Sequence, residues 1–236
     1  MVTLTYQERF KTLRGVFDSF TERTLFSLQS KGAFDELVSP LEVGKESNVF
    51  IAVKDGKKVI VKIYRMQNCD FNQMYDYIRK DPRYEFLKKQ RRSIIIAWTQ
   101  REYKNLLKAE KAKISSPKAI SWKNHIVVEE FIGDENAAPQ LKDTIPLDPE
   151  KFFEKIIVQL KNLFDAGLIH GDLSAFNILN HHNKPVLIDF SQATLTKTPN
   201  SPELLKRDIK NLLQFFRKLG IHKDEEKVFK RITERE

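Results

Sequence analysis

The chain is poor in cysteine and has no long apolar run, and each absence excludes a class of protein. A single cysteine, Cys69, rules out an internal disulfide and leaves too few thiolates for a cysteine-rich zinc site, so we expect it to be a packing residue. No apolar run approaches the ~18 residues of a membrane span, and the opening MVTLTYQERFK lacks the apolar core of a signal peptide. We therefore expect a cytoplasmic protein with no membrane partner.

Negative charge is also in short supply, because Lys and Arg outnumber Asp and Glu and give a formal net charge of +9. Such a surplus favours an anionic partner. The cluster Lys88-Lys89-Gln90-Arg91-Arg92 is a candidate for direct contact with RNA. The alternative is a solvated, lysine-rich face, which is the usual role of a basic run.

The most informative stretch is LIHGDLSAFNILNHHNKPVLIDFSQ, residues 168–192. Short apolar runs flank its polar loop and predict strands that carry polar residues at their ends, where rigid scaffolds present catalytic groups. The pattern H-x-D-L-x-x-x-N followed by I-D-F is typical of a protein-kinase catalytic loop and its metal-binding segment. The alternative is a polar hairpin turn with a buried His170, because Asp and Asn are common in turns.

The kinase interpretation assigns a task to each polar residue of this stretch. A kinase needs a carboxylate to orient the attacking hydroxyl and hard oxygen ligands to hold Mg²⁺ against the nucleotide phosphates. Asp172 is the candidate for the first task, and Asn177 and Asp189 are the candidates for the second. Asp172 and Asn177 are five positions apart, so one loop can place both on the same side.

Glycine is scarce where a kinase has its phosphate-binding loop. Against the pattern G-x-G-x-x-G-x-V, the segment GKESNVF keeps Gly44 and Val49 but has Ser47 at the last glycine position, and Glu42 stands at the first. Lys45 and Glu46 lie between them. A single glycine is a weak signal for a phosphate loop, so this segment needs support from its surroundings.

That support comes from a predicted hairpin. Residues 47–53 and 57–63 alternate with period two around Asp55-Gly56, which predicts a type I′ turn. The exit strand VIVK places Lys62 where a kinase has its phosphate-binding lysine. A glutamate on a helix behind the sheet must hold such a lysine, and the helix predicted at 92–110 offers Glu102, with Glu110 as the weaker alternative.

The remaining patterns predict an α+β chain, with N-terminal helices in 1–35, an antiparallel sheet in 36–132 and mainly helices in 133–236. On the kinase interpretation, the last two parts are the small and large lobes of a two-lobed kinase-like fold. The expected elements are two helices within 5–32, strands at 118–121 and 126–128, and helices from Asp148-Pro149 to Gly167, from Ser201-Pro202 to Gly220 and over 223–236. About ten residues follow Gln192 before the next helix, too few for an ordinary activation loop, and no A-P-E follows.

With these motifs in place, the sequence resembles the RIO family of atypical serine protein kinases, and its first subfamily in particular, over roughly residues 16–221. The resemblance rests on GKESNVF, VIVKIYR, FNQMYDYIRKDPRYEF, WTQREYKNL, EEFIG with LKD after it, HGDLSAFNIL, IDFSQAT and PNSPELLKRDIKNLLQFF. A glycine-poor phosphate loop and a missing activation loop are traits of this family.

The resemblance implies a kinase and ATPase that binds ATP with Mg²⁺ or Mn²⁺ and acts in maturation of the small ribosomal subunit, with a pre-ribosomal particle or ribosomal RNA as partner. It implies that Asp189 carries a transient phosphate, and that Glu130 and Ile132 offer hinge backbone to adenine. Glu129 departs from the family by placing a carboxylate behind the adenine pocket, and Ala175-Phe176 departs in the catalytic loop.

Two other classes of function remain open at this stage. A small-molecule phosphotransferase of the aminoglycoside or choline kinase type also uses an H-G-D loop, although GKESNVF and DPRY argue against it. A ribosome-binding factor that uses nucleotide only as a conformational switch would share the fold but not the turnover. The lysine and metal positions are all present, which favours turnover.

Overall fold

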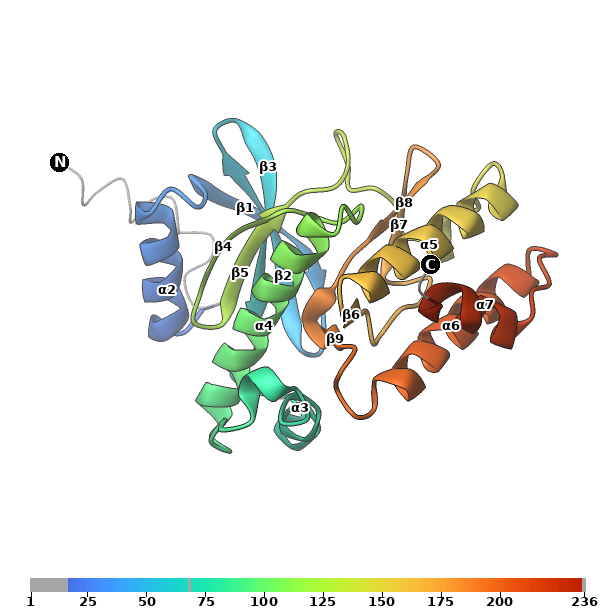
Figure 1. Ribbon diagram of the computed structural model, residues 1–236. Helices are drawn as coiled ribbons and strands as arrows, with labels where there is room; N and C mark the ends of the chain where they lie inside the picture. Colours follow the sequence, from blue (N-terminus) through green and yellow to red (C-terminus); the bar gives the residue numbers. More distant parts are fainter. Residues whose placement is uncertain (1–16, 68, 235–236) are drawn as a thin grey trace.

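The computed structural model describes residues 17–67 and 69–234, in which a sheet-containing part precedes a mainly helical part (Figure 1). Its helices are α2 (Ser19–Ser30), α3 (Phe71–Ile78), α4 (Arg91–Lys111), α5 (Pro149–Asp165), α6 (Ser201–Arg217) and α7 (Glu225–Thr233), with the 3₁₀ turns η1 (Pro82–Tyr84), η2 (Leu141–Asp143) and η3 (Phe190–Gln192). Its strands are β1 (Glu36–Val43), β2 (Ser47–Lys54), β3 (Lys57–Tyr64), β4 (Ala119–Lys123), β5 (Ile126–Glu130), β6 (Leu168–Ile169), β7 (Ile178–His181), β8 (Lys184–Leu187) and β9 (Thr194–Leu195). The predicted α+β class is confirmed.

Five strands form one antiparallel sheet in the order β1-β2-β3-β5-β4. The predicted hairpin joins β2 to β3, and its turn residues Asp55 and Gly56 have φ angles of 48° and 73°. Positive φ at both central positions is what a type I′ turn requires, and glycine adopts it without strain. The turn fixes the register in which Val49 pairs with Lys62.

Successive side chains of β3 point to opposite faces of the sheet and so lie in two different layers. Val59, Val61 and Ile63 join the core beneath α2, which contributes Leu25 and Leu28. The alternate residues Ile60, Lys62 and Tyr64 therefore face the opposite side of the sheet, where α4 packs against β4 and β5. This is how a buried lysine reaches the layer between the sheet and α4.

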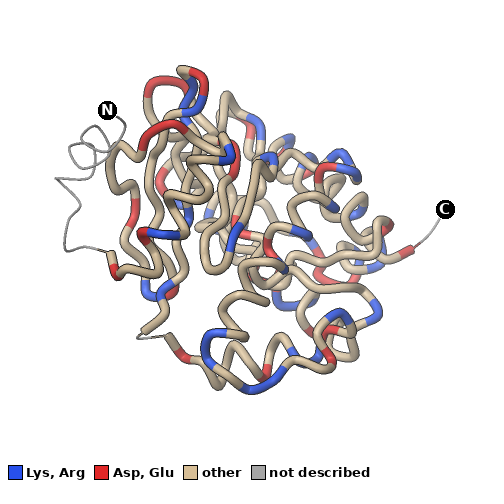
Figure 2. The backbone as a smooth tube through the Cα atoms, turned by 90° about the vertical axis from the view of Figure 1, so that its left-hand side faces the viewer, with Lys and Arg blue, Asp and Glu red and all other residues tan. Residues whose placement is uncertain are grey.

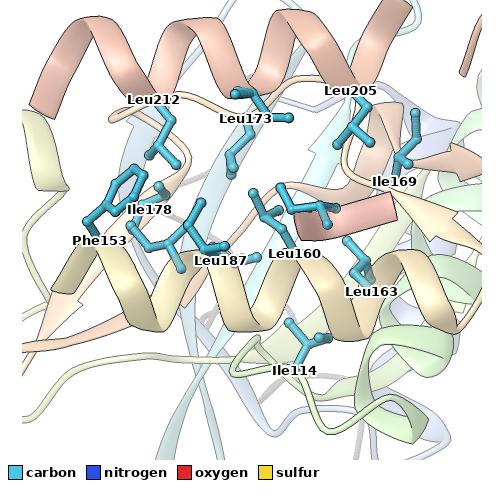
Figure 3. Packing of buried hydrophobic residues seen from close by; sticks show 14 of the residues in the cluster. Ile114, Phe153, Leu160, Leu163, Ile169, Leu173, Ile178, Leu187, Leu205 and Leu212 are labelled. Carbon is cyan, nitrogen blue, oxygen red and sulfur yellow. The ribbon is translucent and has the colours of Figure 1, made fainter. Parts of the chain in front are cut away.

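The helical part is built on α5, α6 and α7. The carboxylate of Asp148 accepts the N–H of Lys151 and caps α5, and Pro149 occupies the first turn, as predicted. Apolar residues from α5, α6 and the strands between them interlock in one cluster (Figure 3). Burial of each such Leu or Phe side chain contributes about 1.5–3 kcal/mol, so this cluster gives the loops above it a rigid base.

Some boundaries differ from the sequence prediction. Helix α6 begins at Ser201, as predicted, but Ser201 is not its cap: Asn200 is at the cap position without a side-chain cap hydrogen bond, and Ser201 Oγ donates to the carbonyl of Thr196 at 2.5 Å. The polar stretch 67–90 holds α3 and η1. The first of the two helices predicted within 5–32 lies largely outside the described residues. Across the described residues, no helix combines the length and apolarity needed to cross a membrane.

Candidate active site

A buried ion pair joins the sheet to α4. Lys62 Nζ lies 2.7 Å from Glu102 Oε1, and the hydroxyl of Tyr64 donates to Glu102 Oε2 at 2.5 Å. Burial alone would lower the pKa of Lys62, but the Asp189 and Glu102 carboxylates raise it well above its usual range. The ammonium form is therefore held in place. Glu110, the alternative partner, is exposed near the end of α4.

Asp189 faces the same lysine from the other side. Its Oδ1 lies 3.0 Å from Lys62 Nζ and accepts the N–H of Ser191 at 3.2 Å. Burial opposes ionisation, yet Lys62 and Ser191 together lower the pKa of Asp189 to about 2. Its backbone is left-handed, with φ 59° and ψ 73°, a strained conformation for a residue with a Cβ that often marks functional loops. Asp189 is thus a fixed carboxylate whose Oδ2 has no partner among the described residues.

Asp172 and Asn177 lie together in the loop between β6 and β7. Asn177 Nδ2 donates to the main-chain oxygen of Asp172 at 2.8 Å. A carbonyl can only accept, so the amide oxygen of Asn177 must point the other way. Gln192 Nε2 donates to Asp172 Oδ2 at 3.2 Å. Burial, and then the charge of Asp189, raise the pKa of Asp172, as suits a group that handles a proton.

Two buried side chains, His170 and Asp208, hold this loop in place. Asp208 was not anticipated from the sequence. His170 Nε2 donates to the carbonyl of Ile188 at 3.0 Å, which ties the loop to the metal-binding segment. Asp208 of α6 accepts the N–H groups of Gly171 at 2.7 Å and Leu173 at 2.8 Å. The available signal was an aspartate on the otherwise apolar face of α6.

A further group, also missed, braces the segment that carries Asp189. Tyr77 Oη and Arg101 Nη2 donate to the carbonyl of Gln192 at 2.7 and 2.8 Å, and Asn105 Nδ2 donates to the carbonyls of Phe190 and Ala193 at 2.9 and 2.6 Å. The signal was a set of polar residues at helical spacing inside the packing face of α4. The polar stretch before α4 thus supports the site.

The segment GKESNVF forms a tight turn between β1 and β2. The N–H of Gly44 donates to the carbonyl of Ser47 at 2.9 Å. A Cβ at position 44 would lie 3.0 Å from that same oxygen, so the close approach favours glycine here without any left-handed φ. Glu46 is half-buried, and burial, followed by the charge of Asp189, raises its pKa. Lys45 is exposed.

The chain leaves β5 through Glu130 and Ile132. The N–H of Glu130 is already bonded to the carbonyl of Lys118 at 2.9 Å, and the carbonyl of Ile132 accepts the N–H of Ala138 at 2.9 Å. The N–H of Ile132 has no hydrogen-bond partner among the described residues. Glu129 lies opposite Ile60 of β3, and burial, aided by the Glu102 charge, raises its pKa to about 8.

The structure brings five of the sequence-predicted residues together and places the other predicted segments beside them. Lys62, Glu102, Asp172, Asn177 and Asp189 converge from β3, α4 and the loops around β6 to β8. The glycine-poor turn and the hinge flank them, with Val49 directly opposite Lys62 on the same face of the sheet. The catalytic and binding roles of these residues stay predictions.

Comparison with known proteins agrees with this geometry. A family model described as the RIO domain matches residues 48–228. The RIO-type serine/threonine-protein kinase Rio1 of Methanocaldococcus jannaschii is 41% identical, covering 98% of this chain and 80% of the relative. Its namesake from Haloferax volcanii is 35% identical, covering 96% of this chain and 79% of the relative.

A solved structure has the same fold. The Rio2 kinase from Chaetomium thermophilum, in a complex described as ADP/Mg²⁺-phosphoaspartate, superposes with a TM-score of 0.69 at 20% identity, covering 90% of this chain and 66% of that one. The predicted kinase-like fold is therefore confirmed. From the family match and the two Rio1 relatives together, this chain belongs to the RIO family and is a kinase of the serine/threonine class.

Proposed function

We propose that this chain binds ATP with Mg²⁺ or Mn²⁺ and transfers the γ-phosphoryl group, acting as a protein serine kinase with ATPase activity in the cytoplasm. The observation that carries the proposal is the convergence of Lys62, Glu102 and Asp189 in one ionic group, in which Lys62 and Glu102 are buried and Asp189 is partly exposed, with Asp172 and Asn177 beside it. A cation fixed between two carboxylates is expected where phosphate charge must be held.

The residues present suit nucleotide binding. The unpaired N–H of Ile132 is the hinge donor for adenine, and the carbonyl of Glu130 is the neighbouring acceptor. Val49 covers the ring from the sheet. The turn around Gly44 and Ser47 lies beside the phosphates, and the Lys62 ammonium contacts them.

The residues also suit a divalent cation, because Mg²⁺ prefers oxygen ligands. The Asn177 amide oxygen is turned away from Asp172, and Asp189 Oδ2 is unpaired, so each offers one hard oxygen. When bound, the metal neutralises phosphate charge.

Asp172 and Asp189 have separate tasks in the proposed chemistry. Asp172, whose pKa is raised, orients the serine hydroxyl or the water that attacks the phosphoryl group and accepts its proton. Asp189 is ionised at any working pH, so the same carboxylate oxygen, when it is not held by the metal, is able to attack the γ-phosphorus. A P–O bond then forms to Asp189, the bond to the β-phosphate oxygen breaks, ADP leaves, and water later hydrolyses the acyl phosphate.

The test of this function is incubation of the purified protein with labelled ATP and Mg²⁺. Phosphate release, phosphoserine and hydroxylamine-labile acyl phosphate are measured separately. Mg²⁺-dependent release of labelled phosphate supports the proposal, and ATP binding without turnover would leave only a nucleotide-switched binding factor.

We further propose that the physiological setting is maturation of the small ribosomal subunit, with RNA contacted through a basic surface formed by Lys88, Lys89, Arg91 and Arg92. All four side chains are exposed at the start of α4, and Phe86 beside them is 92% exposed. Figure 2 shows Lys and Arg spread over the molecule, with one long stretch of them at its lower end, at the height of α3 and the start of α4 in Figure 1. Exposed aromatic rings among cations suit unpaired bases and phosphates.

Binding of a labelled single-stranded RNA tests this surface. Because bound cations release counterions, the affinity must fall as salt rises, and the salt slope must lessen by about one for each phosphate contact removed. The variant carries Gln at the four basic positions. The control carries Gln at four exposed lysines of the helical part: Lys210, Lys218, Lys227 and Lys230. Equal losses in both variants would contradict a specific surface.

A further inference from the structure

Three potential metal ligands meet outside the site described above. Asp134 follows the hinge, His181 is the last residue of β7, and His182 is the first residue of the turn into β8. His182 Nε2 lies 3.1 Å from Asp134 Oδ2, and His181 Nε2 lies 3.7 Å from Asp134 Oδ1. Among the described residues, this is the one group in which three such ligand atoms lie within 4.8 Å of one another.

The backbone holds these residues together. His182 and Asn183 have φ angles of 52° and 59°, so the turn from β7 to β8 keeps both histidines at its tip although neither central residue is glycine. On the other side, Gly133 has φ 150°, and a Cβ there would lie 2.2 Å from the carbonyl of Asn136. Only glycine allows that loop to fold so tightly beside the histidines.

Apolar contacts fix one loop against the other. Ile132, in one of these loops, packs with Leu179 of β7 and Val186 of β8. The loop of residues 131–138, here called the hinge loop, and the β7–β8 hairpin therefore pack against one another without any ion. The ligand atoms are already assembled, so a metal would not have to reorganise the chain.

The spacing of the ligand atoms suits a tetrahedral ion. Zinc binds imidazole nitrogen and carboxylate oxygen at about 2.0–2.2 Å, which places neighbouring ligands about 3.3 Å apart. Asp134 Oδ1 lies 3.4 Å from His182 Nε2 and 3.7 Å from His181 Nε2, slightly wider than this value, so small side-chain rotations would close the site on an ion. In addition, His181 Nε2 is shielded from solvent and has no hydrogen-bond partner among the described residues. A buried nitrogen without a partner is one that a metal ion could satisfy.

We propose that Asp134, His181 and His182 bind one divalent transition-metal ion of the zinc class, with water completing the coordination. Two imidazoles and one carboxylate select Zn²⁺, Co²⁺ or Ni²⁺ over Mg²⁺, which prefers oxygen ligands. The ion would link the hinge loop to the β7–β8 hairpin and so stiffen the segment that carries the Ile132 N–H. The site is separate from the proposed magnesium ligands, Asn177 and Asp189.

The test uses untagged protein that has been treated with a chelator and then saturated with Mg²⁺, so that the kinase site is occupied. Co²⁺ is titrated and followed by its visible absorption, and Zn²⁺ is titrated by calorimetry. We expect one ion per chain, an absorption band of tetrahedral intensity, and a rise in Tm on metal addition, because the ion binds the folded state.

Three variants and one control decide the outcome. His181→Asn, His182→Asn and Asp134→Asn should each weaken the affinity for Co²⁺ and Zn²⁺ at least tenfold, while His222→Asn, at an exposed histidine preceding α7, should leave it unchanged. The Tm of each variant without metal reports whether it still folds. Mg²⁺-dependent ATP turnover of the metal-free variants separates this site from the proposed function.

Wild-type affinity in the three variants, or no bound ion in the wild type, would overturn the proposal. Loss of Zn²⁺ binding in Asp189→Asn alone would overturn it too, because the ion would then occupy the kinase site.

Discussion

Lys62 Nζ lies 2.7 Å from Glu102 Oε1, so one buried ion pair joins β3 to α4. Both side chains are almost fully shielded from solvent, with exposed fractions of 9% and 0%. Removing one member of such a pair leaves an uncompensated buried charge, which costs about 3–5 kcal/mol. The pair is therefore a structural unit, and we predict that it is also a functional one.

Lys62→Ala and Glu102→Ala should weaken the same step, because the task proposed for Glu102 is to position Lys62 on the phosphates. A misplaced group costs about 100-fold in turnover, so we expect each variant to lose about that much kcat/KM for ATP. The double variant should lose little more than Lys62→Ala alone. Glu110→Ala, an exposed position on the same helix, is the matched control. A double variant showing the product of both losses would disprove the pairing.

Asp208→Ala should damage the catalytic loop without touching the substrate. It leaves the buried N–H groups of Gly171 and Leu173 without an acceptor, at about 1–3 kcal/mol each. We expect a lower Tm and a fall in kcat that exceeds the change in KM for ATP, since Asp172 lies between those two residues. Lys210→Ala, exposed on the same helix, should change neither quantity. Unchanged kcat in a folded Asp208→Ala protein would show that the anchor is dispensable.

Much of the fold follows from local sequence patterns. The Asp55-Gly56 turn, the period-two strands around it and the Asp148-Pro149 start of α5 were all predicted, because each depends on residues next to one another in the chain. Helix α6 begins at the predicted Ser201, but this serine is the first helical residue and not the cap. Ser201 has the chemistry of a cap, but the nearby carbonyl of Thr196 takes its hydroxyl instead, and sequence alone does not reveal such competition.

The site was predictable only in part, for a related reason. Asp172, Asn177 and Asp189 lie within one short motif, and the Lys62–Glu102 contact follows from a kinase resemblance. The support from Tyr77, Arg101 and Asp208 depends on side chains that bond main-chain carbonyls or N–H groups far away in sequence. A pattern of residue types does not predict those partners, because any loop offers such main-chain groups.

Glu129 should make stability depend on pH. Its pKa is raised from 4.5 to about 8 by burial, followed by the Glu102 charge. Between these pH values the folded protein keeps a proton that the unfolded chain releases, so this group lowers stability as pH rises through that interval, and the loss is constant above it. Glu129→Gln removes the effect.

We therefore expect the difference in free energy of unfolding between Glu129→Gln and the wild type to grow in favour of the variant from about pH 5 to about pH 8. Denaturant unfolding at several pH values measures it. A difference that stays flat over this range would show that Glu129 is ionised in the folded protein at pH 5.

Asp172 and Asp189 should differ in what their loss abolishes, although both are acidic loop residues. Asp172→Ala removes the group proposed to orient the attacking oxygen, so ATP binding should persist while phosphorylation of a protein substrate falls at least 100-fold, the upper range of general base catalysis being about 10⁴-fold. Asp189→Asn removes a proposed metal ligand and the proposed phosphate acceptor. It should abolish both Mg²⁺-dependent ATP turnover and hydroxylamine-labile label.

The geometry makes this last outcome specific. Lys62 and the Ser191 N–H occupy one oxygen of Asp189, which leaves the other for the metal or the γ-phosphorus. Asn at this position keeps the size but lacks the charge and the nucleophilic oxygen pair, so binding of ATP without Mg²⁺ should survive. Recovery of only hydroxylamine-resistant phosphoserine from the wild type, at full ATPase rate, would exclude an aspartyl phosphate and leave direct transfer from ATP to serine, with Asp189 serving the metal alone.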